Sequence, residues 1–234
     1  ALLSFSITNA VALSIIYNKG ENNEIEIYDN QVNDNNPAAG IIDFHIVFPG
    51  KLIIIGTVLE ERTLLPNNQI QNTVTLTRTL SSGIESTDYT LSFESSSFSQ
   101  PPIDTGTVHL EGTYHSLTDT IGADSSVSFE GFLNSIPLAK ISAGFADEVS
   151  PHKFAPQDII VSFEGNPPPG PEITLAGKLT VRQTNPGDVW TEPCSSSVSV
   201  TSTNAKDSDS DGVWDEGDDC PDTPADAIVY PLVA

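Results

Sequence analysis

Residues 3–17 read Leu-Ser-Phe-Ser-Ile-Thr-Asn-Ala-Val-Ala-Leu-Ser-Ile-Ile-Tyr, a run in which large apolar side chains alternate with small or polar ones. Asn9 is the one exception in the apolar row. A period of two is typical of a β-strand with one buried face. A strand of this length would span about 50 Å, whereas most strands have about five or six residues. The run therefore predicts either two strands that bend at Asn9 or one long strand that reaches beyond its own domain.

The same period recurs along most of the chain, in segments rich in Val, Ile, Thr and Phe. Clusters of Gly, Pro, Asn and Ser separate these segments, as expected for turns. Helical periodicity is nearly absent, and only residues 142–149 are expected to form a turn of helix. Many short strands predict an all-β fold, a β-sandwich or jelly-roll-like domain. The predicted strands are 24–28, 41–48, 52–59, 73–80, 89–93, 107–111, 126–132, 159–164, 173–181 and 198–203.

The charge balance narrows the class of partner. The chain has 234 residues with 32 acidic and 9 basic side chains, a net charge of −23. Nine basic side chains are too few to form a basic patch. Neither nucleic acid nor an anionic membrane surface is therefore expected as a partner. No segment reaches the roughly 18 apolar residues of a membrane helix, so membrane insertion is not expected. A chain without Met that starts at Ala1 predicts a processed, secreted protein that is extracellular or at the cell surface.

The chain has two cysteines, Cys194 and Cys220. In an exported acidic protein a single pair favours a disulfide over a metal or redox site. A disulfide that closes the loop between these two cysteines would stabilise the fold by about 3–4 kcal/mol on the chain-entropy model. Two free thiols are the alternative.

The composition changes sharply near residue 205. Residues 207–226 contain nine acidic side chains and no basic one. Residues 207–218 read Asp-Ser-Asp-Ser-Asp-Gly-Val-Trp-Asp-Glu-Gly-Asp, with acids at loop positions 1, 3, 5, 9 and 12 and glycine at 6. Ca²⁺ takes six to eight oxygen ligands, which a loop with this spacing presents inward, whereas Mg²⁺ keeps its waters. The predicted calcium ligands are Asp207, Asp209, Asp211, the backbone carbonyl of Val213, Asp215 and Asp218.

With the residues that follow, this segment resembles a thrombospondin type 3 repeat. Residues 219–224 read Asp-Cys-Pro-Asp-Thr-Pro and complete the match over 207–224. The resemblance implies structural calcium binding, sometimes of two ions per repeat, with the cysteine held in a disulfide. Trp214 departs from the usual small residue or proline, and a single repeat must pack against another part of the protein or another subunit. The rest of the chain matches no family by its motifs.

These features divide the chain into four parts. Residues 1–17 form the long N-terminal strand, 18–204 the β-sandwich, 205–226 the calcium loop and 227–234 an apolar tail. A strand too long for one sheet can complete the sheet of a neighbouring copy. The inserted row would be Leu3, Phe5, Ile7, Val11, Leu13 and Ile15.

Other residue patterns favour ordinary structural roles. The Asn-rich residues 18–36 favour a polar hairpin and loop, with a second calcium site as the alternative. His109 and His115 near Asp119 could be a transition-metal site but are typical of surface strand residues. Neighbouring acids such as Glu60 and Glu61 point to opposite faces of a strand, which disfavours a glycosidase pair. No catalytic constellation stands out, so the chain is not expected to be an enzyme.

The sequence therefore predicts a non-enzymatic, secreted, calcium-binding structural protein. It would be the subunit of an extracellular filament or surface assembly, a homopolymer joined by strand complementation. The alternative is a monomeric β-sandwich module at the cell surface that binds carbohydrate or mediates adhesion, with a structural calcium site.

Overall fold

The computed structural model describes residues 12–49, 52–65, 69–83, 87–99, 103–115, 124–144, 152–163, 172–184 and 189–202. Within these residues the fold is an all-β sandwich, as the sequence predicts. The strands are β1 Ser14–Tyr17, β2 Ile25–Tyr28, β3 Ile41–Phe48, β4 Leu52–Leu65, β5 Gln69–Gly83, β6 Thr87–Glu94, β7 Phe98–Ser99, β8 Ile103–His115, β9 Ser126–Leu133, β10 Ile136–Gly144, β11 His152–Ser162, β12 Glu172–Ile173, β13 Leu175–Gln183 and β14 Val189–Ser202.

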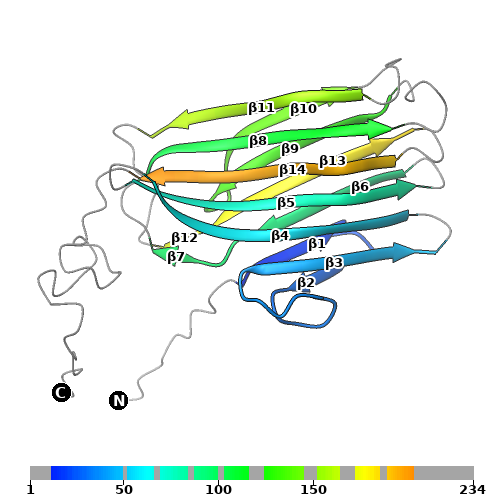
Figure 1. The fold of residues 1–234 in the computed structure, drawn as a ribbon, viewed down its shortest axis with the longest axis horizontal. Coiled ribbons are helices and arrows are strands. Elements are labelled where there is room, and N and C mark those ends of the chain that lie inside the picture. The colour runs from blue at the N-terminus through cyan, green and yellow to red at the C-terminus, as the bar shows by residue number, and fades with distance from the viewer. Residues whose placement is uncertain are drawn as a thin grey trace, which may run out of the picture.

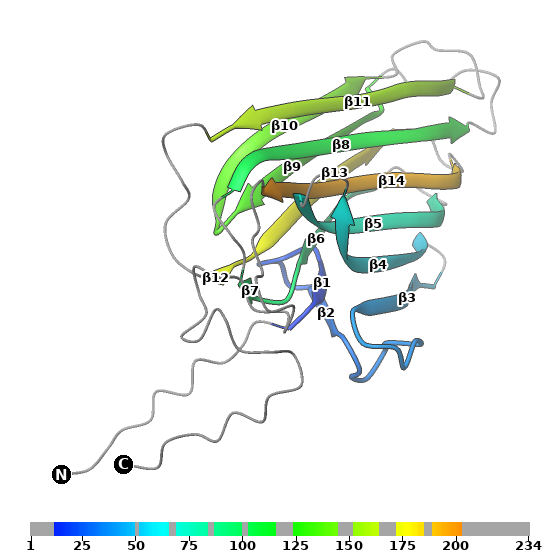
Figure 2. The ribbon, with the colours of Figure 1, turned by 60° about the vertical axis from the view of Figure 1, so that its left-hand side comes forward.

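Two six-stranded antiparallel sheets form the layers (Figure 1). Sheet A has the order β10-β9-β13-β6-β1-β2, and sheet B has the order β11-β8-β14-β5-β4-β3. The strands of sheet B run across the front of Figure 1, and those of sheet A cross behind them obliquely. Figure 2 brings forward the end of the sandwich where the short β7–β12 pair lies.

The core lies between the sheets because alternate residues of each strand point inward. In β13, Leu175, Leu179 and Val181 are fully buried, while the intervening Lys178 and Arg182 are exposed. Phe93 of β6 and Phe129 of β9 stack in the core, with ring centroids 5.8 Å apart. Burying an apolar side chain of this size contributes about 1.5–3 kcal/mol, so these inward rows hold the two layers together.

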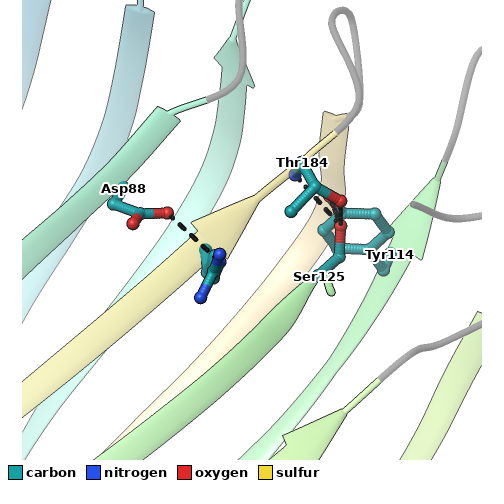
Figure 3. Close-up of polar contacts among 5 residues, drawn as sticks. Asp88, Tyr114, Ser125 and Thr184 are labelled. Atoms are coloured by element: carbon teal, nitrogen blue, oxygen red, sulfur yellow. Dashed lines mark hydrogen bonds and ion pairs between the residues drawn. The ribbon is translucent and has the colours of Figure 1, made fainter. Parts of the chain in front are cut away.

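Two hydroxyl groups and a tyrosine join the sheets at one end of the sandwich (Figure 3). The buried Ser125 Oγ lies 3.0 Å from Thr184 Oγ1 and accepts a hydrogen bond from the Thr184 N–H at 3.2 Å. Tyr114 Oη, from β8 in sheet B, donates to the same Ser125 oxygen at 3.4 Å. Beside them, Arg182 Nε and Asp88 Oδ1 are 4.0 Å apart and exposed, a geometry that contributes little to stability.

Most of the predicted strands are present, with differences at their ends. Residues 41–48 form β3 with the expected bounds, whereas β4, β5, β8 and β14 extend several residues beyond the predicted segments. The expected helical turn at 142–149 is wrong at its start: Ser142, Ala143 and Gly144 belong to β10 and pair with β9. Residues 145–149 lie outside the described residues.

Only the end of the long alternating run falls in the described part of the chain. Ser14–Tyr17 form β1, which pairs with β2 on one side and β6 on the other. Leu13 and Ile15 of the predicted assembly row are buried in the core. Asn18, with a φ of 47°, ends the strand, and its side-chain oxygen accepts the Thr90 N–H at 2.9 Å. Leu3, Phe5, Ile7 and Val11 lie outside the described residues.

The outer face of sheet B is lined by hydroxyl groups along its central strands. Ser197 of β14 pairs with Thr75 of β5 and His109 of β8, and Ser199 pairs with Thr73 and Thr107. Neither Ser195 nor Thr201, which continue this row of β14, carries a charge. The outward row of β14 is therefore polar but neutral, and Glu111 of β8 pairs with Ser195 at one end of it.

Candidate functional site

A groove of about 250 Å³ lies on the outer face of sheet A. The register brings residues from four strands together there: Phe132 of β9 pairs with Ala176 of β13, Ala176 with Glu94 of β6, and Glu94 with Ser14 of β1. In the next row Lys178 pairs with Ser92, and Ser92 with Ile16. The groove is lined by Ser14, Ile16, Lys19, Ser92, Phe93, Glu94, Phe132, Ser135, Ala176, Gly177 and Lys178.

The floor of the groove is apolar and closely packed. Ile16 points away from the sandwich core, yet only 9% of it is exposed, and Ser14 beside it is 5% exposed. The half-buried Phe132 and Ala176 continue this floor toward β9. Below it, Gly177 leaves room for the stacked rings, because a Cβ there would lie 2.4 Å from Phe93 Cζ and 2.7 Å from Phe129 Cε2.

Charged groups line the groove above this floor. Lys178 and Lys19 are exposed, and Glu94 is half-buried. Next to them the row continues with Glu130 of β9, which pairs with Lys178, and with Lys140 of β10, which pairs with Glu130. Positive and negative side chains thus alternate across this face, so it offers both donors and acceptors of hydrogen bonds.

An aromatic residue stands at the far side of the same face. Tyr28 of β2 pairs with Ser14, and its hydroxyl donates a hydrogen bond of 3.0 Å to Glu26 Oε2. This hydrogen bond to Glu26 raises the pKa of Tyr28 above its ordinary value of 10.0, with smaller contributions from burial and from nearby acids. Tyr28 therefore stays neutral throughout the physiological range, and its hydroxyl proton is held by Glu26.

The arrangement can bind a small polar molecule that has one apolar face. Ligand sites typically combine an apolar lining with a few placed polar groups in about 300–1,000 Å³, and this groove is slightly smaller than that range. The floor of Ile16, Phe132 and Ala176 is suited to aliphatic C–H groups. Glu94 and Lys178 would then contact hydroxyl groups at the edge of the molecule.

Nothing local in the sequence indicates this groove. Lys19, Glu94, Phe132 and Lys178 are distant in sequence and are brought together only by the order and register of the strands. The only signal is that polar residues occupy alternate positions of each strand, which is also the pattern of an ordinary solvent-facing sheet. These residues are therefore not among those predicted from the sequence.

The predicted calcium ligands Asp207, Asp209, Asp211, Val213, Asp215 and Asp218 lie outside the described residues. Cys220 lies outside them too. Cys194 is described: its thiol is fully buried in β14 and lies 3.8 Å from the carbonyl oxygen of Thr113. The predicted disulfide and calcium loop stay predictions.

The Asn-rich region forms the β1–β2 hairpin and a loop, residues 29–40, that we call the Asx loop. Backbone N–H groups donate hydrogen bonds to the carboxylates of this loop. Asp34 Oδ1 accepts from the N–H of Asn36 at 2.9 Å and of Asp43 at 3.1 Å, and Asp34 Oδ2 accepts from Asn30 at 2.9 Å. Asp29 accepts from the Gly40 N–H at 2.9 Å. These acids thus act as acceptors that fold the loop.

The histidines do not form a site together. His109 and His115 lie six residues apart on β8, a separation of about 20 Å along a strand. His109 Nδ1 instead contacts Asp158 Oδ1 of β11 at 2.7 Å, with Glu111 Oε1 4.0 Å from Nε2. Among the described residues, no group of three His, Cys, Asp or Glu side chains could hold a metal ion. The same residues include no helix long and apolar enough to cross a membrane.

Comparisons with known proteins find little similarity to this chain. No known protein family and no curated protein matches the sequence. Among solved structures, the carbohydrate-binding module TmCBM61 in complex with β-1,4-galactotriose aligns with a TM-score of 0.27 and 6% identity, over 57% of this chain and 71% of that one. The galactotriose is a ligand of that module.

Proposed function

We propose that the protein is a non-enzymatic, extracellular β-sandwich module that binds a saccharide in the groove on sheet A. The observation that carries the proposal is the pairing of an apolar floor with charged groups. Ile16 and Phe132 form the floor, and Glu94 and Lys178 lie beside it. A sugar ring has this character, because its C–H groups form an apolar face and its hydroxyl groups project around the edge.

The size of the groove sets the scale of the ligand. About 250 Å³ is enough for one or two sugar units but not for an enclosed oligosaccharide. Because the groove lies on an open sheet face, the ends of a longer chain can extend into solvent. The expected ligand is therefore one short stretch of a polysaccharide.

Binding of the full-length protein to an array of neutral and acidic glycans tests this proposal. The best ligand is then measured by calorimetry with Phe132→Ala and Lys178→Ala. Each is expected to weaken binding at least tenfold, because one removes the apolar floor and the other a donor. Lys140→Ala is the matched control, an exposed lysine of the same face that does not line the groove. Binding that both groove variants leave unchanged would contradict the proposal.

Calcium binding belongs to the same proposal and rests on the sequence of residues 207–224. The spacing of its acids and its resemblance to a thrombospondin type 3 repeat support a structural calcium ion. The acidic composition, the cysteine pair and this repeat support an extracellular location. In this function calcium stabilises the protein and takes no part in ligand recognition.

A second candidate function is the subunit of an extracellular filament or surface assembly. One observation favours it: an edge strand of sheet B carries exposed apolar side chains, Ile159 and Ile160 of β11. An open edge of this kind can pair with an extended segment of another chain. The two functions are compatible, because this edge and the groove lie on different sheets.

A further inference from the structure

The two six-stranded sheets have four edge strands, and three of them carry a feature that hinders pairing. β2 has only four residues. β10 contains Pro137 and a bulge between Pro137 and Ala139. β3 is covered at Asp43 by the Asx loop, because the N–H of Asn35 donates to the Asp43 carbonyl at 2.9 Å and Asp34 accepts the Asp43 N–H. Short length, proline, bulges and covering loops are the usual means of preventing edge-to-edge pairing.

The fourth edge strand, β11, is protected only in its first half. Pro156 and a bulge between Phe154 and Gln157 interrupt that half. From Gln157 onward the strand pairs regularly with β8. This second half is therefore a straight, uninterrupted edge.

The backbone of this half presents hydrogen-bonding groups outward. Phe163, which follows β11, donates its N–H to the Asp104 carbonyl at 2.8 Å. Because residues that bond to the neighbouring strand alternate in an antiparallel pair, Ile159 and Val161 face β8 in the same way. The N–H and C=O groups of Asp158 and Ile160 then point away from the sheet, where an added strand would bond.

The side chains along this edge are apolar and partly uncovered. Ile160, on the outer face of sheet B, is 68% exposed, and Ile159, on the inner face, is 38% exposed. Phe163 and Leu138 pack inside this edge, each within 3.3 Å of where a Cβ on Gly106 would lie. A strand beside β11 would therefore cover Ile159 and extend this end of the core.

We propose that this edge, Asp158–Ile160 of β11, accepts the N-terminal segment of a second copy of the chain as an added strand of sheet B. The proposal rests on the second candidate function, the assembly subunit. Residues 1–11 precede the described part and read Ala-Leu-Leu-Ser-Phe-Ser-Ile-Thr-Asn-Ala-Val, which contains no charged side chain. In a chain with a net charge of −23, such a neutral segment can approach another copy with little repulsion.

The alternation of this segment matches the two faces of the edge. With Leu3, Phe5 and Ile7 inward, its apolar row would cover Ile159 and lie beside the core. Ser4, Ser6 and Thr8 would then face outward, next to Ile160 and in line with hydroxyl-bearing residues such as Thr107. A shift by one residue would place serines against the core, so the pairing has a defined register.

The segment of the same molecule is too short to reach this edge. β1 is four strands away from β10 in sheet A, and β10 contacts β11. An added strand outside β11 is thus about five strand spacings, or 24 Å, from β1. Leu13 already lies in line with β1, because its carbonyl accepts the Asp29 N–H. With residues 3–7 paired, the chain from residue 7 to Leu13 would span at most about 22 Å. The occupant must therefore come from a second copy.

The test uses two variants of the full chain, one defective at each side of the contact. Ile160→Pro removes an outward N–H without removing a bond to β8, and Phe5→Asp places a charge in the inserted row. Ile160→Thr is the matched control, because it keeps the backbone donor. Oligomeric state is measured by light scattering and electron microscopy, after circular dichroism shows that each variant is folded. Ile159→Lys, which places a charge on the inner face of this edge where the apolar row would pack, replaces the proline variant if that one does not fold.

We expect the unmodified chain and Ile160→Thr to assemble, and each defective variant alone to be monomeric. Mixing the two variants should give dimers that do not grow further, because the mixture has one functional segment and one functional edge per pair. Normal assembly of Ile160→Pro, or assembly of Phe5→Asp through paired β11 edges, would overturn the proposed contact. An unmodified chain that stays monomeric at every concentration would overturn the assembly function itself.

Discussion

Gly177 and Gly131 face each other across β13 and β9, and neither position has room for a methyl group. A Cβ on Gly177 would lie 2.4 Å from Phe93 Cζ, and one on Gly131 would lie 2.6 Å from Val108 Cγ2. The neighbours are rigid core side chains. The glycines therefore set how closely the aromatic rings and the valines pack against the centre of sheet A.

We predict that Gly177→Ala lowers the free energy of unfolding by about 1–3 kcal/mol, the usual cost of forcing extra volume into a packed core. Urea unfolding measures this. Gly144→Ala is the control, because a Cβ there has no atom within 4 Å, and it should change stability by less than about 0.5 kcal/mol. Equal effects of the two substitutions would show that packing at Gly177 is looser than described.

Tyr17 makes stability depend on alkaline pH. Burial, with the neighbouring Tyr89 as the second cause, raises the pKa of Tyr17 above 10.0. Above pH 10 the unfolded chain loses this proton before the folded protein does, so stability is complete below pH 10 and falls as the pH rises further. Tyr17→Phe should reduce that fall by at most about 1.4 kcal/mol per pH unit, as measured by urea unfolding between pH 9 and 12. An unchanged slope would contradict this assignment.

The strands were predictable because their signal is local. Alternating burial in β3 and β13 follows directly from the order of apolar and polar residues. β10 was missed because Pro137 and its bulge interrupt the alternation. The groove could not be predicted, since its floor joins Ile16, Phe132 and Ala176, which come from strands that neighbour one another only in the folded sheet.

The Asx loop protects β3, and Asp34 is its central acceptor. We predict that Asp34→Ala lowers the free energy of unfolding by about 1–3 kcal/mol, because three backbone N–H groups lose their acceptor. Hydrogen exchange of the Asp43 amide should become faster at the same time. Asp124→Ala, at an exposed acid outside the loop, is the control. Unchanged exchange at Asp43 would show that the edge of β3 is covered by other contacts.

For the whole molecule, we predict that calcium raises thermal stability through residues 207–218. Calcium at about 100 times its dissociation constant would add about 2.7 kcal/mol, and a chelator would remove it. The double variant Asp209→Asn with Asp211→Asn should lose this response, as followed by the melting temperature. Asp124→Asn should keep it. A double variant that still responds to calcium would exclude this loop as the site.

The neutral hydroxyl rows of sheet B have an electrostatic consequence for a protein with a net charge of −23. The outward row of β14 carries no charge, and Glu111 of β8 stands beside only one end of it, at Ser195. Two molecules that meet at Ser197 and Ser199 are therefore separated by uncharged groups at the point of closest approach. Repulsion between copies then comes from more distant charges, which salt screens over about 8–10 Å under physiological conditions. Crowding would thus orient neighbouring molecules with these neutral faces toward each other.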